Sequence, residues 1–419
     1  MIAKHTLQNG LRIIGQKSKG TLAASVLVVI KTGSRNETPK IHGISHFLEH
    51  MCFKGTVRRK TAPDIARETD SMGAKYNAFT SKEFTGYYIQ ADKKFFDKSL
   101  DILSDMTFYS VLAQKEIEKE SGTIIEEINM YEDTPMYNIS DIFEEILFEN
   151  QQMAQSVIGE KDVIKSITSD VMKQYRDKYY TAGNVIVSCA GNLPDDYTNR
   201  IEKYFGDVPE GADDYAGKRT NKIYNQRVRL SKKDTEQAHV YMGLESYDVN
   251  SPDRFATDLL ATIIGGNMSS RLFMEVREKR GLAYYIKAVD ESNHDTGMFT
   301  VRAGLNVAKT EEAVKIIRNE LLRAGSSIKE EEVKRAKDYI FGTMALSEEN
   351  SINVADQNGL EEIIGGKALT LEERIKLYNK VALDDVLRVA NDIFKPEKLK
   401  LAIIGPYENE QKFAKILEG

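Results

Sequence analysis

Apolar and polar positions follow one another along this 419-residue chain in an order that occurs twice. The apolar runs Val185–Gly191 (VIVSCAG) and Leu399–Gly405 (LKLAIIG) each predict a buried strand that ends in glycine. Each run follows a helical pattern, which begins near Asp170 in one case and near Asp385 in the other. A repeat with a period of 214 to 216 residues indicates that one fold is duplicated in the chain.

Helical segments upstream of these strands repeat with the same period. Residues 95–106 (FFDKSLDILSDM) and 116–127 (EIEKESGTIIEE) resemble 310–321 (TEEAVKIIRNEL) and 332–343 (EVKRAKDYIFGT). Each copy therefore has strands first, long helices next and strands again, which predicts two homologous α+β domains. We place them at the following ranges, which leave a polar, glycine-containing linker between them: domain 1–208, linker 209–226 and domain 227–419.

The apolar run Thr21–Ile30 (TLAASVLVVI) is too short to cross a membrane and predicts a buried strand. The first residues carry no basic segment followed by an apolar run, so we expect no signal peptide and a cytoplasmic protein. A net charge of −6 without a basic stripe argues against nucleic acid as a partner. Cys52 and Cys189 are the only cysteines and lie in different halves without CxxC spacing, which argues against a disulfide framework or a cysteine-built metal site.

Candidate chemistry is concentrated in the segment 40–53, which contains HFLEH. If this segment forms a helix of about 100° per residue, His46, Glu49 and His50 share one face. The opposite, apolar side consists of three residues: Ile44, Leu48 and Met51. Two imidazoles at i and i+4 suit a divalent cation, and the carboxylate between them suits a base beside a bound water. Alternatively, the histidines are surface or core residues, although HxxEH arises by chance in only about one such chain in a hundred.

A catalytic zinc site with two histidines needs a third protein ligand, and a predicted helix near 117–128 offers carboxylates. Glu120 and Glu127 border its apolar stripe on one side, whereas Glu126 points away. Helix geometry favours the first two and does not choose between them. The alternative is an acidic helix face exposed to solvent.

The two copies differ at the positions that carry this chemistry. Opposite the histidine face, the second copy has three apolar residues: Leu260, Ile263 and Ile264. Thr343 stands opposite Glu127. We therefore expect any chemistry to belong to the first copy.

Three motifs resemble the pitrilysin and mitochondrial processing peptidase family of inverted zinc peptidases: GISHFLEHMCFKGT, KYNAFTSKEFTGYY and EIEKESGTIIEEINMYEDTP. The 76 residues between His50 and Glu127 match that family's spacing to its third ligand. The resemblance implies one zinc ion per chain, bound by His46, His50 and Glu127. It further implies that Glu49 activates water, that Glu120 supports the site, and that each domain packs a mainly antiparallel sheet against long helices.

The resemblance extends to substrate-binding positions. In SSRLFMEVREKRGLAYYI, Arg277 and Tyr284 match an arginine and a tyrosine that contact substrate in the family. Asn77 and Ala78 match an edge strand that pairs with a peptide main chain. The alternatives are a surface ion-pair residue with a core-edge aromatic for the first pair, and an ordinary hairpin strand for the second. The long glycine-rich loop of the non-catalytic processing subunit is absent from IIGGNMSSRLF, so strict presequence cleavage is not implied.

Together with these motifs, the resemblance implies a zinc endopeptidase that acts on extended peptides within a chamber formed by a homodimer. Two alternatives remain open: a non-catalytic scaffold or peptide clamp, and an active subunit that pairs with an inactive homologue. The intact HFLEH motif weighs against the first, and the retention of Arg277 and Tyr284 weighs against the second.

Overall fold

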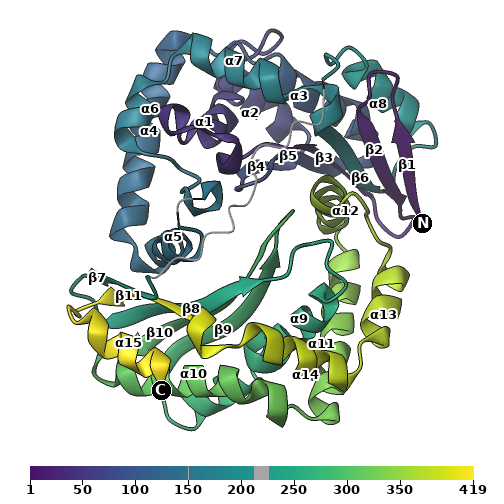
Figure 1. The fold of residues 1–419 in the computed structure, drawn as a ribbon. Helices are drawn as coiled ribbons and strands as arrows, with labels where there is room; N and C mark the ends of the chain where they lie inside the picture. Colours follow the sequence, from purple (N-terminus) through teal and green to yellow (C-terminus); the bar gives the residue numbers. More distant parts are fainter. Residues whose placement is uncertain (150, 212–225) are drawn as a thin grey trace. The chain divides into compact units, whose positions relative to one another are not determined.

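The computed structural model describes residues 1–149, 151–211 and 226–419 (Figure 1). These residues form two compact units. The first contains the described residues of Met1–Asn129, Gln155–Lys218 and Met344–Leu371, and the second those of Met130–Ala154, Arg219–Thr343 and Glu372–Gly419. Of the predicted linker 209–226, residues 212–225 lie outside the described part of the chain.

A six-stranded sheet forms the centre of the first unit, in the order β1-β2-β6-β3-β5-β4. Its strands are β1 (Ile2–Thr6), β2 (Arg12–Lys17), β3 (Ala23–Ile30), β4 (Lys75–Thr80), β5 (Thr85–Asp92) and β6 (Val185–Gly191). Within it β2 and β6 are parallel and the other neighbours are antiparallel. The apolar run predicted as a strand is β3, which is buried along nearly its whole length. Strand β4 ends the sheet, and its outer edge pairs with none of the described strands.

Helices pack around this sheet, and their bounds are α1 (Ile44–Met51), α2 (Ala62–Ser71), α3 (Phe96–Phe108), α4 (Gln114–Asp133), α6 (Lys161–Ser166), α7 (Ser169–Tyr179), α8 (Tyr197–Phe205) and α12 (Ser351–Gly365). Local sequence sets where α2 begins, because the backbone N–H of Thr61 donates to the carboxylate of Asp64 in a capping box. In α4, the predicted apolar stripe Ile117, Ile124 and Ile128 is buried.

The second unit contains a five-stranded sheet in the order β7-β11-β8-β10-β9. Its strands are β7 (Val228–Lys232), β8 (Gln237–Ser246), β9 (Ala283–Ser292), β10 (Gly297–Asn306) and β11 (Lys400–Gly405). Its helices are α5 (Pro135–Leu147), α9 (Arg254–Ala261), α10 (Thr310–Ser327), α11 (Glu330–Glu348), α13 (Leu371–Lys380), α14 (Leu383–Ile393) and α15 (Glu410–Glu418). Here β7 and β11 are parallel and the other pairs antiparallel. Both sheets confirm the predicted α+β class with mainly antiparallel sheets.

The repeat predicted from the sequence appears as matching elements in the two units: α3 with α10, α4 with α11, α7 with α14 and β6 with β11. One helix of each sequence half completes the other unit. Helix α5 packs on β8 and β11, where Ile139 and Phe143 join a cluster with Tyr241. Helix α12 packs on β3 and β6, where Val354 and Ala355 join a cluster of the first unit. The compact units are therefore not continuous in sequence, whereas the predicted domains 1–208 and 227–419 are.

None of the helices in the described ranges is both long and apolar enough to cross a membrane.

Candidate metal centre

Helix α1 carries the HFLEH residues with the two faces that its periodicity predicts. Ile44, Leu48 and Met51 are buried in the core of the first unit. On the other face, His46 is 8% exposed, and Glu49 and His50 are partly exposed. Gly43 precedes the helix at φ 94°, where a Cβ would lie 2.8 Å from the Cα of Gly159. Glycine is therefore required at the entry to this helix.

Glu127 of α4 reaches the two histidines of α1. Its Oε2 lies 3.8 Å from His46 Nε2 and 3.6 Å from His50 Nε2, and the two imidazole centres are 4.6 Å apart. Among the described residues, these three form a group whose potential ligand atoms all lie within 4.8 Å of one another. Glu126, one residue earlier, is exposed, as the helix geometry predicts. Two nitrogens and one carboxylate oxygen are a typical donor set for a catalytic zinc ion, which keeps its fourth position open.

The surroundings of the two histidines shift their pKa values in opposite directions. Burial, followed by the charge of His50, lowers the pKa of His46 to about 3, so this imidazole is neutral at pH 7. His50 Nδ1 lies 2.9 Å from Glu120 Oε1, and a proton held there leaves Nε2 with a free lone pair toward Glu127. Burial lowers the pKa of His50, but the hydrogen bond with Glu120 and the charges of Glu49 and Glu127 outweigh it and raise the pKa of this imidazole. A cation that binds at His50 Nε2 therefore has to displace a proton.

Glu120 lies behind His50 and is 4% exposed. Its second carboxylate oxygen forms an ion pair with Lys54 Nζ at 2.6 Å. Burial opposes ionisation of Glu120, but the bonds from His50 and Lys54 outweigh it and lower the pKa of this carboxyl. The two candidates that helix geometry left open therefore lie differently, because Glu127 faces the Nε2 atoms and Glu120 contacts His50 at the opposite nitrogen.

Glu49 stands beside this group without belonging to it. Thr80 Oγ1, at the end of β4, donates a hydrogen bond of 2.5 Å to Glu49 Oε2. Burial raises the pKa of Glu49, although the bond from Thr80 and the charge of His50 act in the other direction. A carboxylate with a raised pKa can take up and release a proton near neutral pH.

A buried hydrogen-bond chain fixes the start of α1. The carboxylate of Glu37 accepts from the backbone N–H groups of Gly43 at 2.6 Å and Ser45 at 2.8 Å. Ser45 Oγ lies 2.7 Å from the hydroxyl of Tyr175, which lies 2.6 Å from Thr32 Oγ1. Burial raises the pKa of Glu37 to about 8, against the effect of those backbone bonds. These contacts hold the first turn of α1, which carries His46.

Sequence reasoning missed three supporting residues, namely Thr80, Lys54 and Glu37. Thr80 follows Ala78 by two residues, so a strand places both side chains on one side of the sheet. Lys54 follows His50 by four residues, which is the spacing of helical neighbours. Glu37 carries no comparable local signal, because it reaches α1 through the chain turn at 38–43.

Comparison with known proteins assigns the family. The family description insulinase (peptidase family M16) matches residues 12–161, and peptidase M16 inactive domain matches residues 166–340. An uncharacterized zinc protease of Bacillus subtilis is 36% identical over 410 residues, covering 98% of this chain and 99% of that protein. The chain belongs to peptidase family M16. This assignment confirms the predicted resemblance to the pitrilysin and processing peptidase family.

The chain is also similar to a second zinc protease and to a solved structure. An uncharacterized zinc protease of Streptomyces coelicolor is 32% identical, covering 98% of this chain and 91% of its own length. The crystal structure of a protease from Helicobacter pylori superimposes with a TM-score of 0.89 at 24% identity, covering 97% of this chain and 99% of that one. The structural likeness concerns the fold alone.

The predicted peptide-binding pair lies on β4 of the M16 chain. Asn77 is exposed and Ala78 partly so, and β4 pairs only with β5 among the described strands. The backbone N–H of Ala78 donates to the Oδ1 of Asn77 at 2.9 Å. This edge strand therefore has a backbone donor that its own neighbouring side chain occupies.

Arg277 and Tyr284 lie in the second unit. Arg277 is exposed, and its guanidinium lies 4.9 Å from the ring centre of Phe273. Tyr284 is near the start of β9 and is 57% exposed. Both side chains thus lie at the surface of the second unit.

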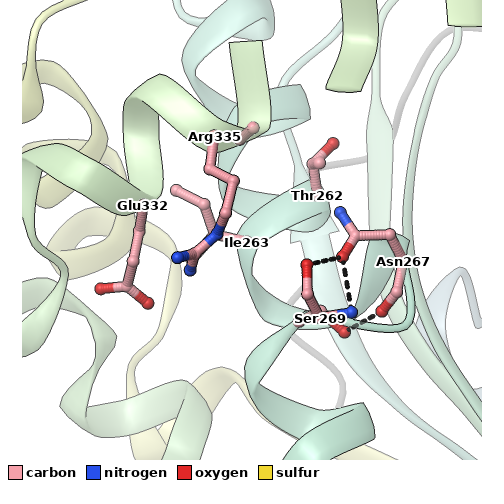
Figure 2. Close-up of a pocket in the computed structure, with 8 residues that line it drawn as sticks. Thr262, Ile263, Asn267, Ser269, Glu332 and Arg335 are labelled. Carbon is pink, nitrogen blue, oxygen red and sulfur yellow. Dashed lines mark hydrogen bonds between the residues drawn. The ribbon is translucent and has the colours of Figure 1, made fainter. Parts of the chain in front are cut away.

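In the second unit, the segment that matches α1 has apolar residues where α1 has His46, Glu49 and His50. Leu260, Ile263 and Ile264 are buried there, as predicted from the repeat. Figure 2 shows the small pocket beside them, where Ser269 donates from its backbone and hydroxyl to Asn267 Oδ1 at 3.0 and 2.8 Å. The polar groups of this loop therefore bond to one another. Within the described residues, the group that could hold a metal ion belongs to the first unit.

Proposed function

We propose that this M16 protein is a zinc-dependent endopeptidase that hydrolyses extended or unstructured peptides. The observation that carries the proposal is the convergence of His46 Nε2, His50 Nε2 and Glu127 Oε2 on one point. The names of the zinc proteases to which the chain is similar support the choice of metal.

His46, His50 and Glu127 would hold one zinc ion per chain. When bound, zinc supplies Lewis-acid polarisation of the scissile carbonyl and lowers the pKa of the attacking water. Glu120 keeps the proton of His50 on Nδ1, so that Nε2 remains a donor atom.

Glu49 would act as the general base and then as the general acid. Its carboxylate accepts the proton of the attacking water and passes it to the amine that leaves. The raised pKa caused by burial suits both steps, because the protonated form persists long enough to protonate the amine.

Strand β4 would bind the peptide main chain by strand addition. A carbonyl of an extended peptide replaces the Asn77 side chain at the N–H of Ala78. Such pairing depends on an extended peptide backbone more than on the peptide's sequence. Folded proteins, whose backbones are already paired, should therefore resist cleavage. Arg277 and Tyr284 would contribute a bond to a substrate carbonyl and a donor to the oxyanion, respectively.

We further propose a cytoplasmic homodimer that encloses its substrate, in which each chain supplies both the metal ligands and the Arg277/Tyr284 pair. A heterodimer with an inactive homologue is the alternative assembly. Sedimentation of the purified chain together with a peptidase assay separates the two. Activity that arises only after a second protein is added contradicts the homodimer.

The second candidate function is a peptide clamp without catalysis, favoured by the match of residues 166–340 to a domain described as inactive. Metal content measured beside hydrolysis of an unstructured peptide decides between clamp and peptidase. We expect zinc in both the wild type and Glu49→Gln, with turnover lower by about 10²- to 10⁴-fold in the variant. A zinc-loaded wild type that binds peptide without cleaving it supports the clamp.

A further inference from the structure

The carboxylate of Glu49 has one hydrogen-bond donor among the described residues. Thr80 Oγ1 donates to Oε2 at 2.5 Å, and Oε1 has no such bond. A carboxylate side chain that turns freely presents its lone pairs in many directions, whereas one bond to a fixed hydroxyl selects a narrow range. The orientation of the Glu49 carboxylate therefore depends on how firmly the Thr80 hydroxyl is held in place.

Thr80 is fixed by the hairpin that joins β4 to β5. It pairs with Thr85 across the two strands, and the backbone N–H of Ser81 donates to Phe84 O at 2.8 Å in the turn. The bonded turn holds the end of β4 in one conformation. Thr80 is the last residue of β4, so its hydroxyl is held in one position as well.

The same hairpin is tied to the segment that leads into α1. The backbone N–H of Arg35 donates to Lys82 O at 2.8 Å, and the Arg35 side chain pairs with Glu83 at 2.5 Å. Both charged side chains are 3% exposed, so removing either partner would leave a buried charge without its ion pair. A Cβ on Gly33 would lie 2.2 Å from Ser81 O, which shows how closely the two segments approach. The hairpin and the segment before α1 thus form one rigid support.

We propose that Thr80 is a positioning residue for Glu49: its hydroxyl holds Oε2 and leaves Oε1 to accept the proton of the attacking water. This inference rests on the proposed peptidase function. Because Ala78 and Thr80 lie two residues apart on β4, their side chains share one side of the sheet. Strand β4 would therefore position both the bound peptide and the carboxylate of Glu49. The position of the base relative to the scissile bond would then stay constant.

Thr80→Val tests the proposal because valine keeps the shape and removes the donor. We expect kcat to fall about tenfold to a hundredfold, with KM within about twofold and zinc affinity unchanged. Thr80→Ser restores the donor and should recover kcat to within about threefold. The matched control is Thr69→Val in α2, where the hydroxyl bonds only to the carbonyls of Ile65 and Ala66 and where kcat should not change.

Three results would overturn the proposal: an unchanged kcat in Thr80→Val, a loss confined to KM, or a serine variant as impaired as the valine variant. If zinc-loaded wild type cleaves no peptide, the proposed function fails by itself. Crystal structures of wild type and Thr80→Val then decide the positioning claim. A carboxylate of Glu49 that keeps its place without the hydroxyl contradicts the claim, and one that turns or becomes disordered supports it.

Discussion

His50 Nδ1 and Glu120 Oε1 lie 2.9 Å apart, and this contact determines which nitrogen of His50 remains for a metal. Glu120 is itself held by Lys54 at 2.6 Å. Glu120 and Lys54 would therefore affect a bound metal through the imidazole of His50. Substitutions of these two residues should change zinc affinity more than the rate of catalysis.

Glu120→Gln should weaken zinc binding by about 10- to 100-fold, because the amide cannot match the charged acceptor that orients His50. Competition with a chromogenic chelator measures this affinity. Glu118→Gln serves as the control, since Glu118 lies on the exposed face of the same helix. Equal zinc affinities for Glu120→Gln and wild type would show that the contact does not orient His50.

Glu127→Gln should lose zinc at concentrations that saturate the wild type, with affinity reduced by at least about a hundredfold. Glu126→Gln differs by one position on the same helix and points to solvent, so it should bind zinc like the wild type. Metal content after dialysis, measured by mass spectrometry, compares the two variants. Zinc retained by Glu127→Gln and lost by Glu126→Gln would reverse our assignment of the third ligand.

Subunit exchange tests the proposed homodimer. A mixture of Arg277→Ala chains and Glu49→Gln chains should recover part of the wild-type activity, because some mixed dimers combine an intact metal site with an intact Arg277. Each variant alone should stay inactive or nearly so. If mixing under exchange conditions restores no activity, a shared site between chains is wrong.

Stability should depend on pH through Asp290 in β9. Burial raises the pKa of Asp290 to about 8, against a bond of 2.5 Å from Ser246 Oγ. In the unfolded chain this carboxyl ionises near pH 4. The folded state therefore holds a proton that the unfolded state has lost, so this contribution to stability is full below about pH 4 and disappears as pH rises toward 8.

Asp290→Asn removes that contribution, and its free energy of unfolding should fall less than that of the wild type between pH 5 and pH 8. We expect a difference on the order of a few kcal/mol. Urea unfolding at the two pH values measures it. If the free energy of unfolding changes equally with pH in the variant and the wild type, Asp290 is ionised in the folded protein.

Gly359 of α12 faces the first sheet, where a Cβ would lie 3.1 Å from the Cβ of Ser188 and 3.3 Å from Leu27. Gly359→Leu should therefore destabilise the protein by about 1–3 kcal/mol through overpacking. Gly342→Ala in α11 is the control, because nothing lies within 4 Å of its added Cβ, and alanine should stabilise that exposed helix by about 0.5–1 kcal/mol. Urea midpoints compare the two, and a neutral Gly359→Leu would mean that α12 does not dock closely.

Local periodicity was sufficient for the parts of the site that lie on one element. The two faces of α1 and the border positions of Glu120 and Glu127 follow from helical spacing alone. The spacing cannot say which carboxylate faces a metal, since that depends on how α4 lies against α1. Thr80 escaped prediction because its partner, Glu49, is 31 residues away in sequence.

The same limit explains the exchanged helices. The apolar face of α5 is visible in the sequence as candidate core, but an amphipathic helix does not specify which of two similar sheets it covers. The signal of α12 is weaker, because its buried side includes Asn358 and Glu362. Because the fold is duplicated, the two sheets offer such a helix nearly the same local surface. Only tertiary contacts, such as that of Phe143 with Tyr241 in the second unit, distinguish them.

The late arrival of α12 has a consequence for synthesis. Helix α12 begins 160 residues after β6 ends, so at about 5–20 residues per second its docking surface on the first sheet waits roughly ten to thirty seconds on the ribosome. During that interval Leu27, Val29 and Ile186 lack the helix that covers them. Until residues 351–365 have been translated, the nascent chain therefore exposes apolar sheet surface of the kind that chaperones bind.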